Sequence, residues 1–391
     1  MSVGATAHLG DVASFVRGIT FKPGDVVPVG LDNSVACMRT SNVQSDIDLS
    51  DVWGIPESFV KRDDQYLAVG DLLVSSANSW NLVGKCCWVP DLPWRATFGG
   101  FISVLRGDSA KIEPRYLYHW FSSPRVQTTV RSFGQQTTNI SNLNVERCLR
   151  LPLPLPPLPE QRRIAEILDK ADALRAKRRA ALAQLDTLTQ SIFLDMFGDP
   201  ATNPKGWPVR RLDSICGLVN GRAFKPEEWE EDGVPIIRIQ NLNDASKPFN
   251  YTTQAIPERF RVRPGDILFS WSGTPGTSFG CFRWNGPEGW LNQHIFNVKL
   301  DGSMDGDFFI AHINLKLVEL IAKAHGGVGL QHVTKGMVDE TMLMIPPENQ
   351  QAAFARRIHA VNSIVDMQNA AYVGADSLFI SLQHRAFRGE L

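Results

Sequence analysis

The chain of 391 residues contains an internal repeat whose period is about half its length. Gly18–Pro23 (GITFKP) returns as Gly221–Pro226 (GRAFKP), and Gly70–Ser75 (GDLLVS) returns as Gly265–Ser270 (GDILFS). Solenoid units are only roughly 20–50 residues long, so a period of this size indicates a duplicated domain. We therefore expect two related domains that carry two related sites.

Three shorter matches support the duplication. Written as first copy and second copy, they are Arg39–Asn42 with Arg238–Asn241, Phe101–Val104 with Ile295–Val298, and Pro156–Gln161 with Pro346–Gln350. The number of residues between a first-copy string and its second-copy match decreases along the chain, as small loop insertions would produce. The proline–glutamine elements mark the end of each copy.

The composition is that of a folded protein long enough for two domains of ordinary size, with 43% hydrophobic and 21% charged residues. Net charge is −1 and no basic tail is present, so a polyanion site would be a local patch. The six cysteines form no C-x-x-C pair or Cys/His cluster, so we expect no zinc site. Without a signal peptide or an apolar run near about 18 residues, we expect a cytoplasmic protein outside the membrane.

Two segments have the pattern of long helices. Between Glu160 and Phe197 there is no Pro or Gly, Pro159 fits a helix start, and Gly198 fits a helix stop. A rise of 1.5 Å per residue makes this helix roughly 57 Å long. Its apolar residues follow the alternating four-three spacing of a coiled coil, and they are Ile167, Ala171, Leu174, Ala181, Leu185, Leu188 and Ile192.

The C-terminal segment has the same pattern before Gly389. Its apolar seam includes Phe354, Ile358, Val361, Val365, Phe379 and Leu382. Two such helices in one chain most simply pair with each other in antiparallel orientation. The alternative is a helical bundle inside one compact protein.

The predicted fold class is α+β, with two duplicated α/β domains joined by two long antiparallel coiled-coil helices. The domains span residues 1–155 and 201–346, and the helical segments span 156–200 and 347–391. Within the domains we expect strands at 234–239, 265–271 and 294–300 and helices at 116–121 and 308–324. Ser141 and Thr334 are predicted N-caps of short helices.

Catalytic signatures are missing from the sequence. There is no phosphate-binding G-x-x-x-x-G-K-[ST] loop and no Asn/Asp-Pro-Pro-aromatic string of amino-methyltransferases. His294, His325 and His332 lie near one another in the second copy, but two of their counterparts in the first copy are not histidines. We expect structural histidines, no metal site and no catalytic residue.

Polar loops rich in Ser, Asn, Gln and Gly follow equivalent strands in both copies. Such side chains donate to and accept from base edges, and Gly lets a backbone approach a groove closely. The candidate DNA-contacting residues in these loops are Ser75, Ser76, Asn78, Trp80, Asn81, Gln135, Gln136 and Asn139 in the first copy, and Ser270, Ser272, Thr274, Thr277, Gln331 and His332 in the second. The loops diverge while the flanking strands agree, as expected for readers of different targets. The alternative is that these loops are solvated connections.

A repeated pair of polar residues adds a second candidate. Arg39 and Arg238 are each followed three residues later by an asparagine, Asn42 and Asn241. Arg can bridge guanine or clamp phosphate, and Asn can pair with adenine. A structural salt bridge with a capping Asn would also explain this pair.

The sequence resembles the specificity (S) subunits of type I restriction–modification systems along its whole length. The matching strings are Leu151–Ile164 (LPLPLPPLPEQRRI), Ser191–Pro200 (SIFLDMFGDP) with Asn203–Pro208 (NPKGWP), Arg385–Leu391 (RAFRGEL), and the paired GDLLVS and GDILFSWSGTPG elements. The first of the paired elements lacks the Ser-Gly-Thr continuation of the second, so residue-by-residue transfer to the first domain is weaker.

The resemblance implies two target-recognition domains, each reading one half of a split double-stranded DNA sequence. It also implies that the helices set the gap and dock two methyltransferase (modification) subunits. Restriction subunits would then complete an ATP-dependent endonuclease. S-adenosylmethionine, ATP and Mg²⁺ would bind those partners, so this chain would be non-catalytic and would hold no cofactor. We expect it to bind DNA weakly on its own, because partners could supply much of the phosphate contact.

Two alternative functions remain at this point. A single-chain restriction enzyme would need nuclease or methyltransferase motifs, and the sequence contains none that we identify. The second alternative is a duplicated protein-interaction scaffold that does not contact DNA. Replacing residues 1–150 by another first domain would distinguish the two. Only the DNA reader would change half of its methylated sequence.

Overall fold

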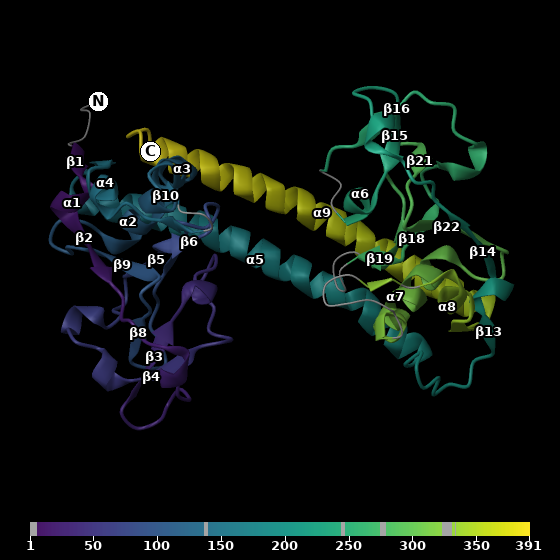
Figure 1. Cartoon of the computed structure of the whole chain (residues 1–391), viewed down its shortest axis with the longest axis horizontal. Helices are drawn as coiled ribbons and strands as arrows, with labels where there is room; N and C mark the ends of the chain where they lie inside the picture. The colour runs from purple at the N-terminus through teal and green to yellow at the C-terminus, as the bar shows by residue number, and fades with distance from the viewer. Residues whose placement is uncertain (1–5, 137–139, 244–246, 274–278, 323–330, 333) are drawn as a thin grey trace. The chain divides into compact units, whose positions relative to one another are not determined.

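The computed structural model describes residues 6–136, 140–243, 247–273, 279–322, 331–332 and 334–391 (Figure 1). Its residues divide into two units with mixed helices and strands. Unit 1 comprises Met1–Arg178 and Ala371–Leu391, and unit 2 comprises Arg179–Ala370. The predicted helical segments are therefore shared, because each long helix contributes one part to each unit.

Unit 1 is built on two sheets. The larger sheet is antiparallel with strand order β2-β9-β5-β7, formed by β2 (Ala13–Arg17), β9 (Ile102–Gly107), β5 (Leu72–Ser75) and β7 (Cys86–Trp88). The smaller sheet has the order β4-β3-β8, formed by β4 (Trp53–Pro56), β3 (Ser34–Met38) and β8 (Ala96–Phe98). In the smaller sheet β3 and β8 run parallel.

Unit 2 repeats this topology. Its larger sheet has the order β14-β22-β18-β20, formed by β14 (Cys216–Asn220), β22 (Ile295–Leu300), β18 (Ile267–Ser270) and β20 (Gly280–Arg283). Its smaller sheet has the order β16-β15-β21-β17, formed by β16 (Asn250–Thr252), β15 (Val234–Ile237), β21 (Gly289–Leu291) and β17 (Arg261–Val262). The parallel pair recurs as β15 with β21. The domain duplication and the three predicted strands of this copy are confirmed.

A short antiparallel ladder joins the start and end of each domain. In unit 1, β1 (Thr6–His8) pairs with β12 (Pro152–Pro154), and in unit 2, β13 (Val209–Arg211) pairs with β24 (Met342–Met344). The second strand of each ladder leads directly into a long helix, so the ladder ties that helix to its domain.

Shorter helices complete both units. In unit 1 they are α1 (Leu9–Val12), α2 (Pro114–Phe121), α3 (Pro124–Ser132) and α4 (Val145–Leu149); in unit 2 they are α6 (Ile239–Asn243), α7 (Gly306–Ala322) and α8 (Lys335–Asp339). Thr334 caps α8 by accepting a hydrogen bond from the Met337 amide at 3.4 Å. The prediction for Ser141 was wrong, because this residue is buried in a strand and Asn144 caps α4 instead, accepting from Arg147 at 3.0 Å.

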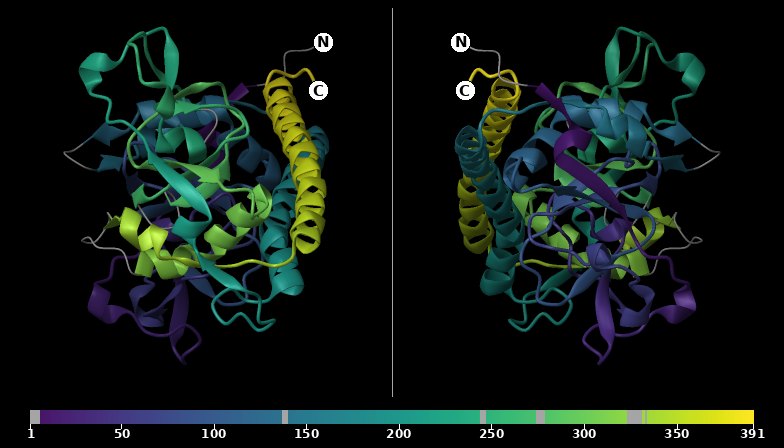
Figure 2. Two further views of the ribbon diagram at one scale, coloured as in Figure 1. Left: turned by 90° about the vertical axis from the view of Figure 1, so that its right-hand side faces the viewer. Right: turned by 90° about the vertical axis from the view of Figure 1, so that its left-hand side faces the viewer.

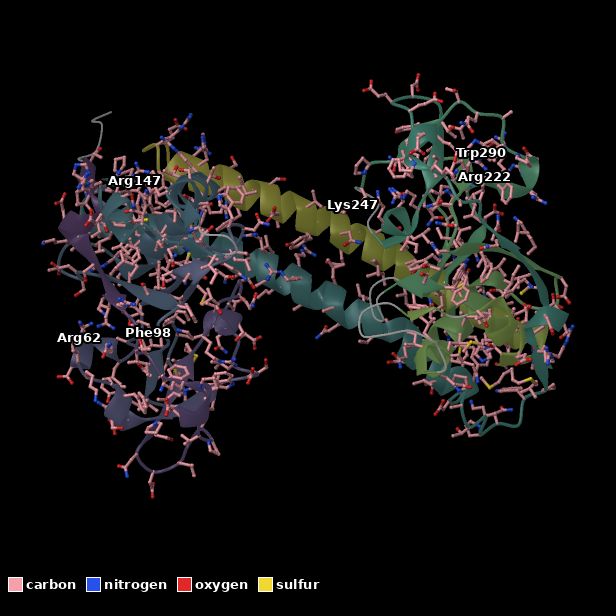
Figure 3. The ribbon with its side chains drawn as sticks, in the orientation of Figure 1. Arg62, Phe98, Arg147, Arg222, Lys247 and Trp290 are labelled. Carbon is pink, nitrogen blue, oxygen red and sulfur yellow. The ribbon has the colours of Figure 1, made fainter. Side chains whose placement is uncertain are left out.

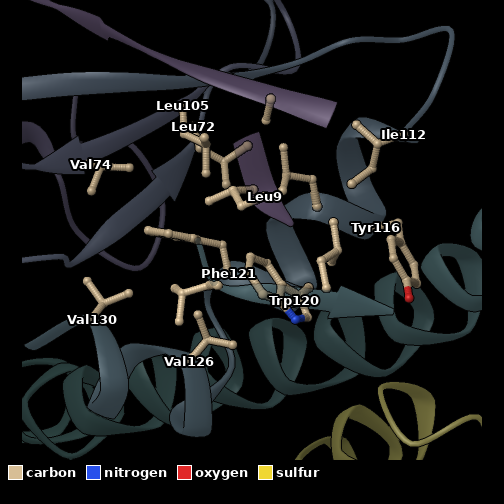
Figure 4. Packing of buried hydrophobic residues seen from close by; sticks show 14 of the residues in the cluster. Leu9, Leu72, Val74, Leu105, Ile112, Tyr116, Trp120, Phe121, Val126 and Val130 are labelled. Carbon is tan, nitrogen blue, oxygen red and sulfur yellow. The ribbon is translucent and has the colours of Figure 1, made fainter. Parts of the chain in front are cut away.

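The main core of each unit lies between the larger sheet, the shorter helices and the long helices. In unit 1, Leu72 and Leu105 from the sheet pack with Tyr116 and Phe121 of α2, as Figure 4 shows. In unit 2 the corresponding cluster is aromatic, and its rings include Phe193, Phe197, Phe308 and Phe354. The smaller sheets have cores of their own, in which Phe98 and Trp290 lie (Figure 3).

The long helices are α5 (Leu158–Phe197) and α9 (Glu348–Ala386). Gly198 and Gly389 follow their ends with φ of +81° and +74°, a conformation that Gly adopts without strain. In unit 1, Arg175 of α5 forms an ion pair with Asp376 of α9 at 2.7 Å. Within each unit the early part of one helix lies against the late part of the other, so their pairing is antiparallel (Figures 1 and 2).

The seam on α9 follows the spacing expected from the sequence. Phe354, Ile358, Val361 and Phe379 are buried, and Val365 and Leu382 are half-buried. None of the helices in the described part of the chain is long and apolar enough to cross a membrane.

The seam on α5 follows the predicted one only in part. Leu174 and Leu188 are 41% and 37% exposed, and Ile167, Leu185 and Ile192 are only half-buried. Ala171 of the predicted seam is buried, and other buried residues lie one position later than predicted ones, at Leu168 and Phe193. Arg175 occupies the seam position next to Leu174, where it pairs with Asp376 and covers the Phe379 ring at 4.3 Å. A long side chain that buries its stem and pairs its charge can replace an apolar seam residue.

Candidate nucleic-acid interface

Two polar segments that lie far apart in the sequence meet in unit 1. Strand β6 (Ala77–Asn78) pairs with β11 (Ser141–Asn142), and β11 pairs with β10 (Gln135–Gln136). The loop that follows β5 therefore lies beside the hairpin that follows α3. The sequence singled out both segments as candidate reading loops, and the structure brings them together.

Unit 2 brings its equivalent segments together in the same way. Strand β19 (Ser272–Gly273) pairs with β23 (Gln331–His332), with Ser272 opposite His332. Three candidate residues, Asn139, Thr274 and Thr277, lie outside the described residues. For four further candidates the structure describes the backbone but not the side chain: Gln135, Gln136, Gln331 and His332.

The loop after β5 in unit 1 has a fixed base and an exposed tip. Ser75 is buried, and its hydroxyl accepts a hydrogen bond from the side-chain amide nitrogen of Asn78 at 3.1 Å. Ser76 is half-buried, whereas Trp80 is 51% exposed and Asn81 is also exposed. Ser75 and Asn78 therefore shape the loop, while Trp80 and Asn81 remain accessible to a ligand.

The described base of the unit 2 loop is packed inward. Ser270 and Ser272 are buried, so their hydroxyls shape the loop rather than face solvent. Between them, Trp271 stacks on Phe296 with ring centroids 5.6 Å apart and meets His294 edge-on at 5.0 Å.

Sequence comparison between the copies missed one pair of positions in this region. The sheet registers place Ser75 opposite Ile102 and Ser270 opposite Ile295, so Phe101 is equivalent to His294 and not to Ile295. The backbone agrees: Ser76 donates to the Phe101 carbonyl at 2.9 Å, and Trp271 donates to the His294 carbonyl at 3.2 Å. Strand β9 of unit 1 is therefore equivalent to β22 of unit 2 with Ile102 at the position of Ile295.

The corrected register adds an aromatic position to each interface. Phe101 is 65% exposed and lies beside Ser76 and Ala77. With Trp80 it gives the unit 1 interface two exposed aromatic rings. An apolar residue before a predicted strand carries no signal of exposure, so the sequence alone could not identify Phe101.

The repeated Arg and Asn pairs have structural roles. Asn42 and Asn241 are buried, and their side-chain oxygens accept from the amides of Arg39 and Arg238 at 2.7 and 3.0 Å. Each asparagine therefore caps a turn, which is the structural alternative that the sequence left open. Their amide groups are occupied, so we do not place them in the interface.

Both arginines are held by neighbouring side chains. Arg39 forms an ion pair with Asp51 at 2.5 Å, and its guanidinium lies 3.7 Å from the centre of the Trp53 ring. Arg238 lies over Trp229 at 5.0 Å and donates to Asn250 at 2.9 Å. These contacts hold both arginines against the smaller sheets.

The family model described as "Type I restriction modification DNA specificity domain" matches residues 9–184 and 204–371, one match in each copy. The type I restriction enzyme StySPI specificity subunit of Salmonella potsdam is 24% identical over 99% of this chain and 89% of its own. The EcoKI specificity subunit of Escherichia coli K12 is 23% identical over 98% and 88%.

Two solved structures have the same fold. A chain from a study of "complex assembly and conformational transition of the type I R-M system" aligns over 100% of this chain and 99% of its own, with a TM-score of 0.57 and 16% identity. The type I S subunit from M. genitalium aligns over 98% and 96%, with a TM-score of 0.57 and 13% identity. With both copies matched, the chain belongs to the family of type I restriction–modification DNA specificity proteins.

Proposed function

We propose that this chain is the DNA-recognition subunit of a type I restriction–modification complex, and that each unit reads one half of a split DNA sequence. The observation that carries this proposal is the paired loop cluster. The equivalent polar segments meet in both units, and in both they lie on a larger sheet with the same strand order. The residues at the clusters differ, so the two units would read different half-sites.

The chemistry of the unit 1 cluster suits base contact. Asn81 can donate to and accept from a base edge, and the exposed rings of Trp80 and Phe101 can contact a thymine methyl or an unstacked base. Near-neutral charge argues against broad phosphate binding by this chain alone. Specificity would therefore come from this chain, and much of the affinity from its partners.

The long helices supply a surface for partner subunits. On α9, Ile364 and Met367 in unit 2 are exposed and lie on one face, because a spacing of three residues is close to one helical turn. Leu378 is exposed on the part of α9 that belongs to unit 1. On α5, Leu174 and Leu188 are exposed two heptads apart. We assign these stripes to the docking of two methyltransferase subunits, with the helices setting the gap between half-sites.

Catalysis would lie in the partners. S-adenosylmethionine would bind the methyltransferase subunits, and restriction subunits with ATP and Mg²⁺ would make the assembly an endonuclease. The match to the family model and the lack of catalytic motifs in this sequence support this division. The complex would act on DNA in the cytoplasm.

A domain exchange tests the proposal. Residues 1–150 are replaced by the first domain of another family member, and methylated adenines are mapped genome-wide in cells that carry the original or the exchanged gene. We expect one half of the methylated sequence to change and the other half, with the gap, to stay. A pattern that stays intact, or that changes in both halves, would contradict separate reading by each unit.

A further inference from the structure

Unit 1 contains a groove of about 440 Å³ outside the paired loop cluster. It lies between helices α2 and α3, strand β12 and the C-terminal part of α9, all of which belong to this unit. Apolar side chains form most of its floor and wall, namely Trp120, Val126, Leu151, Phe387 and Ile380. Ile380 is 45% exposed, so the groove offers apolar contact to an incoming chain.

The buried polar groups at the groove already have partners. Gln383 donates to the His119 carbonyl at 2.7 Å, and the Ser123 hydroxyl donates to the Trp120 carbonyl at 2.7 Å. Both side chains are buried. The floor therefore requires no polar ligand, and an occupant would gain mainly by burying apolar surface.

The rim of the groove carries one sign of charge. Arg125, His384 and Arg388 line it and are exposed. No carboxylate side chain lines it, and these three residues form no ion pair with the described residues. An apolar floor with a cationic rim fits an apolar side chain flanked by carboxylates. Duplex DNA would satisfy the rim but not the floor, because its backbone has no apolar group to bury there.

The break that opens this groove is not repeated in the described part of unit 2. In unit 1, Ser122 and Ser123 separate α2 from α3, whereas the equivalent helix α7 runs unbroken from Gly306 to Ala322. The position of Trp120 is taken there by the buried His312, since Glu113 and Asp305 occupy equivalent positions ahead of their helices. The two copies would thus offer unequal surfaces to two identical partners.

We propose that this groove binds an acidic and apolar segment of a methyltransferase subunit, and that it does so for only one of the two methyltransferase subunits. This inference rests on the proposed function, because that function supplies the partner. The two otherwise related docking events would then differ in affinity, and the complex would assemble in a fixed order.

The test uses the full chain and the purified cognate methyltransferase. The variant is R125E/R388E, and the matched control is R17E, a charge reversal at an exposed arginine of the same unit outside the groove. Native mass spectrometry across a titration gives both dissociation constants. We expect the groove variant to weaken one binding event at least about ten-fold and to leave the other unchanged, while the control binds like the original chain.

The outcomes separate the two proposals. Equal weakening of both binding events, or none in either, would overturn the groove assignment and leave the recognition function intact. An original chain that binds no methyltransferase would overturn both. If R125E/R388E lost helical content, the milder I380S variant would replace it under the same expectation.

A photo-crosslinker identifies the occupant directly. p-Benzoylphenylalanine is placed at Ile380 in the full chain, which is then assembled with the methyltransferase and DNA and irradiated. We expect an adduct with one methyltransferase segment that contains Asp or Glu beside apolar residues. An adduct with DNA, with a second copy of this chain or with its own N-terminal residues would refute the assignment.

Discussion

At the residue scale, one glutamine in each unit fixes a long helix to its domain. Gln161 accepts from the Glu113 amide at 2.8 Å and donates to the Pro156 carbonyl at 2.8 Å. Gln351 repeats both bonds, with the Asp305 amide and the Pro346 carbonyl at 2.8 Å each. Both glutamines are buried. Gln161 ends the first proline–glutamine element, and Gln351 directly follows the Pro346–Gln350 string of the second, so the repeated element extends to this residue.

Replacing either glutamine should therefore destabilise the chain. Gln161→Leu leaves the Glu113 amide and the Pro156 carbonyl without these partners. We therefore expect a loss of about 2–3 kcal/mol in the free energy of unfolding. Urea unfolding followed by circular dichroism measures it. Gln190→Leu, at an exposed position of α5, is the control and should change the free energy by less than about 0.5 kcal/mol. Equal effects of the two changes would show that the buried bonds contribute little.

A second prediction concerns pH and His312. This side chain is buried among Phe193 and Phe308, and neither ring nitrogen has a hydrogen-bond partner in the described residues. Burial, aided by the nearby Lys316, lowers the pKa of His312 from 6.5 to about 3. The folded chain therefore keeps a neutral ring while the unfolded chain takes up a proton below pH 6.5.

Stability should consequently fall as the pH falls from 6.5 towards 3. Between pH 8 and pH 5 the expected loss from this one group is about 2 kcal/mol. His312→Phe removes the proton uptake and places a third aromatic ring in the same pocket, so the loss over this range should shrink by that amount. Urea unfolding at both pH values gives the difference, and an unchanged pH dependence would argue against His312 as its source.

At the element scale, each domain contacts a long helix through a carboxylate and a basic side chain, and the two copies place the carboxylate on opposite sides of the contact. In unit 1, Arg115 and His119 of α2 bond Asp169 of α5, with His119 at 2.7 Å. Burial raises the pKa of Asp169, but these hydrogen bonds and charges outweigh it and hold the pKa below its usual value. In unit 2 the acid lies on the domain side, where Asp307 of α7 pairs with His359 of α9 at 3.0 Å.

This reversal should make each domain selective for its own helix. Asp169→His installs the unit 2 residue in α5 opposite Arg115, and we expect a loss of about 2 kcal/mol in stability. Adding Arg115→Asp should restore part of it, with a coupling free energy of about 1 kcal/mol in a double-mutant cycle. Restoration stays partial because His119 loses its acceptor. Glu166→His, at an exposed position of α5, is the control, and zero coupling would contradict the selectivity.

The helices also show how far periodicity predicts a structure. On α9 one apolar stripe follows the four-three spacing, so its seam could be read from the sequence. On α5 the apolar stripe with Leu174 and Leu188 competes with the true seam, which contains Arg175. Hydrophobicity alone favours the wrong stripe, because the burial of an arginine stem depends on Asp376 and Phe379 in a distant part of the chain.

The exposed apolar residues of the two long helices lead to a prediction about docking. Leu174→Glu and Met367→Glu alter exposed apolar residues, so we expect the free energy of unfolding to change by less than about 0.5 kcal/mol. Binding of the methyltransferase should weaken at least about ten-fold, since an apolar contact would be replaced by a charge. Val69→Glu, at another exposed apolar position, is the control. Full methyltransferase binding by both variants would remove the stripes from the docking surface.

At the scale of the whole molecule, the fold class, the duplication and the family could be read from the sequence, whereas individual contact residues could not. The repeated strings indicate the residues that build the shared scaffold, because packing constrains both copies in the same way. The asparagines of the repeated Arg and Asn pairs recur for this reason as turn caps. Exposed positions such as Phe101 carry no repeated signal, since reading loops differ between copies by function.

The balance of charge over the whole chain leads to the last prediction. Net charge is −1, and Arg39, Arg95, Arg238 and Arg261, in or beside the smaller sheets, are engaged in internal ion pairs or ring contacts. Fewer cations are therefore left at these sheets to displace counterions from DNA. Each phosphate contact contributes about −0.9 to the slope of log K against log salt concentration. We expect weak DNA binding and a shallow slope for this chain alone, and a steeper slope with the methyltransferase present. Fluorescence anisotropy on a duplex with the methylated sequence gives both slopes. Equal slopes and equally tight binding would mean that this chain supplies the phosphate contacts itself, and the division between a specific reader and a cationic partner would then be wrong.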